Sequence, residues 1–282
     1  MCTFSIITPV YNNIEYIEKC ILNVISQGKH SLEHLIIDGG SSDGTVQIIQ
    51  KYALQYSHIS WVSEKDKGQS DAMNKGIKLA KGEFISFLNV DDYYSLGTLN
   101  EVSTIISNNT LLSFIVGNCN VWDEKNELIY VNRPRKLKPW HILGGSCFPV
   151  NPSAYFYKKE IHDIVGGYNE ENHFSMDLEF LIETSFVTEM NYYPRNWGNF
   201  RVLPFAKTGN DQINGTLEQK KNVLLNKYIR KSNLKLYLLT YSVKFSKSSK
   251  KKIHLLIKLL MLPFKMVYWK IRKSFFSRIT IL

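Results

Sequence analysis

Short apolar runs alternate with amphipathic segments along the first third of the chain. Four runs are rich in branched and aromatic residues and predict buried β-strands, over 4–9, 35–38, 59–63 and 83–88. Between them, apolar positions recur every three or four residues and predict helices over 14–26, 45–56 and 71–80. This alternation predicts an α/β fold with a mostly parallel sheet flanked by helices, and we expect Pro9 to end the first strand.

A polar loop follows each predicted strand. The second strand runs into Gly39-Gly-Ser-Ser-Asp-Gly-Thr45, which is rich in glycine, hydroxyl and carboxylate groups. Parallel sheets bind their ligands in the crevice outside the carboxyl ends of the strands. The converging loops therefore predict a nucleotide pocket at that edge.

Two adjacent carboxylates, Asp91 and Asp92, follow the fourth strand. Ionised neighbours repel each other, and a divalent cation relieves the repulsion. Oxygen ligands favour Mg²⁺ or Mn²⁺ over zinc, and substrate phosphates usually complete the coordination of such an ion. Alternatively, the pair only caps the next helix.

Four motifs, in this order, resemble the family 2 glycosyltransferases of the GT-A fold. They are Thr8-Pro-Val-Tyr-Asn12, Ile37-Asp-Gly-Gly-Ser-Ser-Asp-Gly-Thr45, Asp66-Lys-Gly68 with Asp71-Ala-Met-Asn-Lys-Gly76, and Asn89-Val-Asp-Asp92. The resemblance is strong over 1–100 and weaker from there to about position 212. It implies a metal-dependent, inverting transfer of a sugar from a nucleoside-diphosphate sugar to an acceptor hydroxyl, of the kind used in bacterial surface-polysaccharide synthesis.

The resemblance also implies roles for residues that bind the donor. Pro9 and Tyr11 would surround the nucleobase and ribose, Asp38 would accept a hydrogen bond from the base, and Asp71 would contact the donor. Each acidic residue has a structural alternative, an Asx-turn for Asp38 and a first-turn or capping role for Asp71. Tyr11 could instead pack on the domain. We expect Asp43 to cap the next helix rather than touch ligand.

Asp91 and Asp92 occupy the metal-binding positions of the family. Many members carry a carboxylate where this chain has Asn89, whose carbonyl can still accept a ribose hydroxyl. This departure leaves open which carboxylate touches the Mg²⁺ or Mn²⁺. We expect Asp92 to ligate the metal directly and Asp91 to bridge to the ribose or to a metal-bound water.

The segment 166–183 resembles the region in which the family places its general base. Asp177 matches that carboxylate, at the start of an amphipathic helix, and Glu179 is its competitor. A first-turn dipole role for Asp177 is the structural alternative. Glu179 and Glu183 lie one helical turn apart, on what we expect to be a solvated face.

Two further segments depart from the family pattern or leave their role open. The segment 151–155 lies where relatives often have an acceptor-side histidine, which is missing here, so no role is carried over. Either Asn210 or Asp211 would reach the metal from a loop that closes over the donor.

The charge of the chain divides near Glu218. The segment 1–218 holds all 25 acidic side chains and 18 basic ones, a net charge of −7, whereas the segment 219–282 holds 17 basic side chains and no acid. We therefore predict a catalytic domain over 1–218, with a donor half at 1–100 and an acceptor half at 101–218, followed by a basic tail at 219–282.

The tail is too apolar to be a nucleic-acid-binding arm. Five cations recur at every seventh position and form one stripe on a helix, at Lys244, Lys251, Lys258, Lys265 and Arg272. This pattern is typical of an interfacial helix on anionic lipid, divided here by Pro263. A membrane span is disfavoured because each central lysine costs about 2.5–3.5 kcal/mol; docking in a partner's groove stays open.

Together these patterns predict an enzyme that is peripheral on the inner face of the plasma membrane and acts on a lipid-linked glycan. The four cysteines form no zinc-like spacing and fit a reducing cytoplasm, and a first strand beginning at Phe4 leaves no room for a signal peptide. Two alternatives stay open, a nucleotidyltransferase and a decayed, membrane-bound nucleotide-sugar binding protein. A dinucleotide-dependent oxidoreductase is excluded because G-x-G-x-x-G is absent after the first strand.

Overall fold

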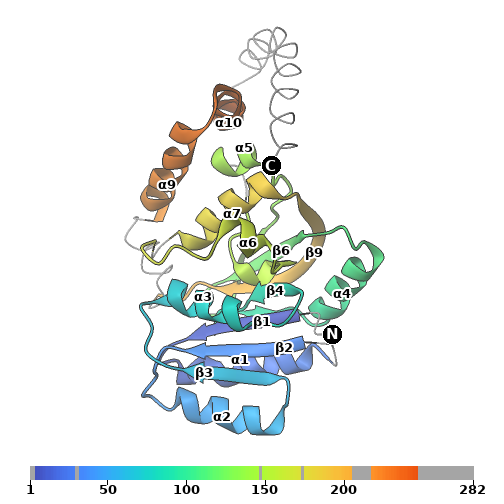
Figure 1. Cartoon of the computed structure of the whole chain (residues 1–282), viewed down its shortest axis with the longest axis vertical. Coiled ribbons are helices and arrows are strands. Elements are labelled where there is room, and N and C mark those ends of the chain that lie inside the picture. Colours follow the sequence, from blue (N-terminus) through green and yellow to red (C-terminus); the bar gives the residue numbers. More distant parts are fainter. Residues whose placement is uncertain (1–3, 29–31, 146–147, 173–174, 205–216, 247–282) are drawn as a thin grey trace, which may run out of the picture.

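The computed structural model describes residues 4–28, 32–145, 148–172, 175–204 and 217–246. Its amino-terminal half alternates strands with helices (Figure 1). The elements are β1 (Phe4–Val10), α1 (Ile14–Ser26), β2 (Leu32–Asp38), α2 (Thr45–Gln55), β3 (Ile59–Ser63), α3 (Gln69–Leu79) and β4 (Phe84–Phe87). The predicted α/β alternation is confirmed in kind and in order.

The four strands are parallel and lie in the order β3–β2–β1–β4. Their carboxyl ends therefore meet at one edge, as predicted. β1 continues past Pro9 to Val10, and Pro9 pairs in register with Ile37, so Pro9 does not end the strand. α3 begins at Gln69, slightly earlier than predicted, because Gly68 can adopt the φ of +119° found at the N-cap.

The second half extends the same sheet. Its elements are β5 (Tyr93–Tyr94), α4 (Thr98–Asn108), β6 (Phe114–Trp122), β7 (Leu128–Asn132), α5 (Pro139–Leu143), a 3₁₀ turn η1 (Pro152–Ala154), β8 (Tyr155–Lys158), α6 (Ile161–Val165), α7 (Met176–Val187) and β9 (Met190–Arg201). Beyond β4 the order is β8–β6–β9–β5, and β7 pairs with β6. β8 runs antiparallel to both of its neighbours, whereas β6 and β9 are parallel.

The two faces of the sheet bury separate apolar cores. α1 and α2 cover one face, where Ile6 and Ile36 meet Ile17 and Ile49. α3 and α7 cover the other face. Alternate residues of each strand serve the two cores, as the period of a strand requires.

Two carboxyl-terminal helices complete the second core, α9 (Leu217–Lys231) and α10 (Leu234–Ser246). Leu225 and Ile229 of α9 are buried in the same core as α7. A Cβ placed on Gly144, after α5, would lie 2.5 Å from Cγ1 of Val243 in α10, so the two segments are in close contact. The segment 219–246, the first part of the predicted tail, therefore packs on the catalytic domain.

The described helices include none with the length and apolar character needed to cross a membrane. Most of the predicted basic stripe, Lys251, Lys258, Lys265 and Arg272, lies outside the described residues. So do Asn210 and Asp211. Cys20 and Cys119 are buried free thiols.

Candidate active site

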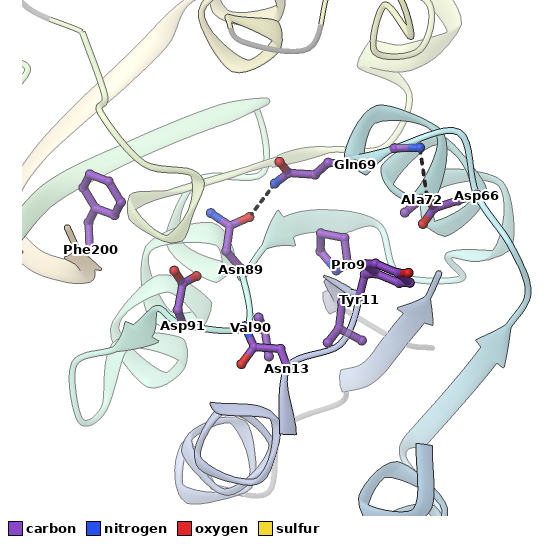
Figure 2. A pocket seen from close by; sticks show the side chains of 12 residues that line it. Pro9, Tyr11, Asn13, Asp66, Gln69, Ala72, Asn89, Val90, Asp91 and Phe200 are labelled. Atoms are coloured by element: carbon purple, nitrogen blue, oxygen red, sulfur yellow. Dashed lines mark hydrogen bonds between the residues drawn. The ribbon is translucent and has the colours of Figure 1, made fainter. Parts of the chain in front are cut away.

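A pocket of about 550 Å³ opens at the carboxyl ends of the parallel strands. Figure 2 shows Asn89, Asp91 and Phe200 on one side of it and Pro9, Tyr11 and Asp66 on the other. Asn13, Gly68, Gln69 and Ala72 also line it. The pocket therefore combines apolar walls with amide and carboxylate groups at the place where the sequence predicted a ligand.

The loop after β1 presents Tyr11 to this pocket. The side chain of Tyr11 is 63% exposed, so it does not pack on the domain, as its structural alternative required. Two hydrogen bonds fix this loop to the loop after β2. Asn12 N–H donates to Ser41 Oγ at 2.7 Å, and Ser42 N–H donates to Asn12 Oδ1 at 2.9 Å. A planar side chain on a fixed loop is suited to stacking on a ligand ring.

Asp38 lies at the end of β2, fully buried and outside the pocket lining. Its Oδ2 accepts hydrogen bonds from Gly40 N–H at 3.0 Å, Ser41 N–H at 2.9 Å and Ser63 Oγ–H at 2.6 Å. The Asx-turn alternative is therefore present. The side chain fixes the loop that in turn holds Asn12.

Two other predicted aspartates also organise helix starts. Asp43 accepts hydrogen bonds from the backbone and hydroxyl of Thr45, as expected. Asp71 accepts a hydrogen bond from Lys67 N–H at 3.0 Å and pairs with Lys75 at 3.4 Å; the bond from Lys67 is the main reason that its pKa is lowered. Asp71 does not line the pocket, whereas Asp66 does.

Asp92 is buried and held by three protein donors. Asn89 Nδ2 lies 3.0 Å and Asn151 Nδ2 2.7 Å from its Oδ2, and Arg201 N–H donates to Oδ1 at 3.1 Å. Asn89 also accepts from Gln69 Nε2 at 3.1 Å, a bond visible in Figure 2. The carboxylate of Asp92 is thus engaged with protein, and Asp92 does not line the pocket.

Asp91, in contrast, lines the pocket. Burial raises the pKa of the Asp91 carboxyl, while the nearby Arg201 guanidinium acts in the opposite direction. Arg201 lies over the rings of Tyr93 and Tyr16 and donates to the carbonyl of Asp91. Asp91, expected to bridge to the ribose or to a metal-bound water, thus faces the pocket, whereas Asp92, expected to ligate the metal, is held by protein donors behind it.

The residues present fit a Mg²⁺ or Mn²⁺ ion that is shared with phosphate. The described part of the chain contains no group of three or more His, Cys, Asp or Glu side chains suited to hold a metal alone. A half-buried carboxylate on a pocket large enough for a nucleotide is, however, the arrangement in which one or two protein oxygens and a substrate phosphate share the ion. Burial raises the pKa of both Asp91 and Asp92, so a nearby cation would favour the ionised form of this acidic pair.

Asp177 lies in the first turn of α7 and is not among the residues that line the pocket. The preceding residue, Met176, accepts a hydrogen bond from Ser70 of α3 at 2.8 Å, and Gln69 and Ala72 of the same helical turn line the pocket. Oδ1 of Asp177 is buried and has no hydrogen-bond partner in the described part of the chain. Burial raises the pKa of Asp177 to about 6, a value suited to a general base near neutral pH.

Glu179 is not solvated, contrary to expectation. It is only 6% exposed, and it accepts hydrogen bonds from Asn172 at 2.7 Å, Lys227 at 3.0 Å and Tyr228 at 3.1 Å. Burial alone would raise the pKa of Glu179, but these bonds outweigh it and the pKa is lowered. Tyr228 also donates to Glu183 at 2.6 Å. Both carboxylates therefore bind α9, which covers the face of α7 that looked exposed.

Sequence reasoning missed several residues of this site. Asn13, Gln69 and Phe200 line the pocket, and Asn151 holds Asp92 although no role was assigned to it. Gln69 had a signal, because it directly follows a glycine in a matched motif. Asn151 and Phe200 are distant in sequence, and no local pattern marks them.

Comparison with known proteins places this geometry in a family. The model of the family described as glycosyl transferase family 2 matches residues 5–164. An uncharacterized glycosyltransferase of Mycoplasma pneumoniae is 28% identical over 180 residues, which cover 60% of this chain and 57% of that protein. The chain thus matches a little over half of that relative's length.

Two solved structures share the fold. TarS of S. aureus, residues 1–349 in complex with UDP, has a TM-score of 0.62 at 18% identity over 88% of this chain and 75% of its own. The mannosyltransferase PcManGT from Pyrobaculum calidifontis, in complex with GDP-Man and Mn²⁺, has a TM-score of 0.62 at 17% identity over 93% and 82%. These similarities confirm the predicted GT-A-type fold.

Proposed function

The chain belongs to glycosyl transferase family 2, and we propose that it transfers a sugar from a nucleoside-diphosphate sugar to an acceptor hydroxyl. The observation that carries this proposal is a pocket at the carboxyl ends of the parallel strands that is lined by a carboxylate, Asp91, and by the loop after β1. Asp91 faces the pocket at the strand ends, and Asp177 begins the helix that contacts the pocket wall through Met176 and Ser70. The first suits a metal-bound diphosphate, and the second suits a base for the acceptor.

The donor would lie along the pocket with its nucleoside between Tyr11 and Asp66. Tyr11 and Pro9 offer flat apolar surfaces for the base, and Asn89 offers amide groups to the ribose. We assign Asp38 to this site through the loop that it fixes, and Asp71 through the start of α3. The UDP in TarS and the GDP-Man in PcManGT support a nucleoside diphosphate as the ligand class.

We place Mg²⁺ or Mn²⁺ at Asp91, with Asp92 behind it as the residue that orients the loop. Such an ion would neutralise the charge on the diphosphate leaving group. The Mn²⁺ in PcManGT supports this assignment. Asp92 keeps the main chain of Asp91 in place through its bonds to Asn89, Asn151 and Arg201.

Asp177 is our candidate for the general base. Its carboxylate would take the proton from the acceptor hydroxyl while that oxygen bonds to the anomeric carbon and the carbon–phosphate-oxygen bond breaks. A single displacement of this kind inverts the anomeric configuration. Asp177 is preferred to Glu179 because their surroundings shift the two carboxyl pKa values in opposite directions. The pKa of Asp177 is raised, which suits a base, whereas that of Glu179 is lowered by its hydrogen bonds to protein groups, which suits a structural role.

The acceptor class follows from charge rather than from the pocket. The segment 219–282 carries 17 cations and no acid, which favours attachment to an anionic membrane surface. We therefore propose a lipid-linked glycan as acceptor and a peripheral position on the inner face of the membrane.

The test is release of nucleoside diphosphate from a panel of UDP-, GDP- and dTDP-sugars, with Mg²⁺, Mn²⁺ or EDTA. We expect one donor to be hydrolysed slowly, with water as acceptor, and only when metal is present. Asp177→Asn serves as the matched control, because it should bind the donor without turning it over. Donor binding without turnover by the unmodified protein would instead indicate the decayed binding protein.

A further inference from the structure

A groove of about 580 Å³ lies between the segment that enters α5 and the turn that joins α7 to β9. One wall carries the cations Arg135, Lys136 and Lys138 together with His141 of α5, and the other wall is formed by residues 185–192. The described residues that line this groove and those that line the donor pocket do not overlap. The groove is therefore a separate feature of the surface.

The groove carries an excess of positive charge. Glu189 is the one carboxylate among its described lining residues, and Oε1 of Glu189 lies 2.6 Å from Nζ of Lys138, so these two charges offset each other. Arg135 and Lys136 are exposed, and no described carboxylate pairs with either. Burial, followed by the charge of Lys136, lowers the pKa of His141, whose ring is therefore neutral. Two positive charges are left without a partner.

Two large apolar side chains stand on the other wall of the groove. Phe186 and Val187, at the carboxyl end of α7, are 48% and 44% exposed, whereas the preceding Ser185 is buried. Single exposed apolar residues are common on protein surfaces. Here two of them are adjacent and line the same groove as two unpaired cations, and this combination favours a partner that is both anionic and apolar.

The groove also lies near the start of the basic carboxyl-terminal segment. Lys138 directly precedes α5, and Gly144, which follows α5, is in close contact with Val243 of α10. α5 spans five residues, a length of about 7.5 Å. Figure 1 shows α5 and α10 at the same end of the molecule. α10 ends at Ser246, less than one turn after Val243, and the segment 247–282 holds ten cations and no acid.

We propose that this groove is a second contact of the catalytic domain with an anionic membrane. Arg135 and Lys136 would meet lipid phosphates, and Phe186 and Val187 would lie at the boundary between headgroups and acyl chains. Cations beside exposed apolar side chains are typical of surfaces that attach to anionic lipid. Two cations neutralise too few phosphates for a nucleic-acid surface. The inference rests on the proposed membrane position, but not on the proposed transfer reaction.

The two contacts would act together. The groove alone is too small to hold the domain on a bilayer, but the basic segment brings it close to the lipid surface. Binding of the groove then becomes an intramolecular step, which raises the affinity of the whole chain even when the second contact is weak. Two separate points of attachment also restrict the rotation of the domain about the first.

The test is the affinity of the full-length protein for vesicles of phosphatidylglycerol and phosphatidylcholine, measured by sedimentation at physiological ionic strength. We expect Arg135→Gln with Lys136→Gln to weaken binding about tenfold, since each cation near the surface contributes about fivefold and salt screens part of it. Lys19→Gln with Lys51→Gln is the matched control. These exposed cations of α1 and α2 give the same net charge but lie on helices that cover the other face of the sheet, so binding should stay unchanged.

The apolar wall is tested in the same way. Phe186→Ser should weaken vesicle binding several-fold, whereas Leu54→Ser, at an 89% exposed position of α2, should not. All four variants should melt at the temperature of the unmodified protein and hydrolyse donor at its rate, because none of these residues lines the donor pocket. Equal vesicle affinities of the two double variants would overturn the inference and leave membrane attachment by the basic segment standing. If the unmodified protein did not bind these vesicles, the inference and the membrane position would both be wrong, and donor hydrolysis would still decide the transfer reaction.

Discussion

Asn151 donates a hydrogen bond to Asp92 across 2.7 Å, joining the turn before β8 to the acidic pair after β4. Asn151 is itself held, because its Oδ1 accepts from the backbone and hydroxyl of Ser153. Asp92 is therefore part of the framework, and its neighbour Asp91 is left to meet the ligand. Adjacent carboxylates of similar appearance in the sequence thus have different physical roles.

The first prediction separates those roles. Asp91→Ala should abolish metal-dependent donor binding with little loss of stability, because it removes a carboxylate whose ionisation burial opposes. Asp92→Ala should lower the free energy of unfolding by about 1–3 kcal/mol, because it leaves the buried amide of Asn151 and the half-buried amide of Asn89 without this acceptor. Calorimetric UDP binding with Mn²⁺ and urea unfolding measure the two effects. If Asp92→Ala lost metal-dependent binding at unchanged stability, direct ligation by Asp92 would be restored.

The second prediction concerns the base. Asp177→Asn should lower kcat by about 10²–10⁴-fold and leave donor affinity nearly unchanged, since the amide keeps the shape but cannot take the proton. Glu179→Gln is the matched control on the same helix. It should weaken the contact with Lys227 and lower stability more than kcat. A larger loss of kcat in Glu179→Gln would mean that the base has been misassigned.

The third prediction follows from the sign of the Asp177 shift. Its pKa is about 6 in the folded protein against 3.8 as reference, so the folded state favours the neutral form. Below about pH 3.8 the Asp177 carboxyl is neutral in both the folded and the unfolded state and does not lower the folding stability. As pH rises above 3.8 the unfolded state ionises first, so the stability falls, and the full loss is reached above pH 6. Asp177→Asn should therefore be more stable than the unmodified protein at pH 8, by up to about 3 kcal/mol, and not at pH 4. Urea unfolding of both proteins at pH 4 and pH 8 measures this difference. An equal difference in unfolding free energy at the two pH values would contradict a raised pKa of the Asp177 carboxyl.

The amino-terminal half was predictable because its signals are local. Strand and helix periods, glycine loops and the acidic pair all lie close in sequence to the structure that they specify. Prediction from local signals fails at Glu179. This residue was expected to be solvated, but α9 covers it. That helix follows only after β9 in the chain, and its many lysines made it resemble a solvated segment. The role of Asn151 could not be predicted for the same reason, since its partner, Asp92, lies 59 residues away in the sequence. Periodicity reports the character of a face, but not which distant segment covers it.

The fourth prediction concerns α10. A chain that ends after Ser246 should keep the folding stability and the UDP affinity of the full-length protein, because α9 and α10 stay docked. Ending the chain after Ser232 removes the contact of Val243 with Gly144 and uncovers the apolar surface of α5, so its stability should fall by a few kcal/mol. Thermal melting of the two shortened proteins measures this. Equal melting temperatures would mean that α10 does not stabilise the catalytic domain, as the domain boundary predicted at residue 218 implies.

The last prediction concerns the basic segment beyond α10. The full-length protein should bind vesicles that contain anionic lipid and release as salt rises, since each cation near the surface contributes about 1 kcal/mol and is screened by salt. The chain that ends after Ser246 should not bind them. Charge reversal of Lys251, Lys258 and Lys265 together should weaken binding more than reversal of Lys250, Lys252 and Lys270, which have the same total charge but lie off the seven-residue stripe. Equal effects of the two triple variants would show that net charge, and not a helical stripe, causes the binding. Equal binding to neutral vesicles would contradict electrostatic attraction as its cause.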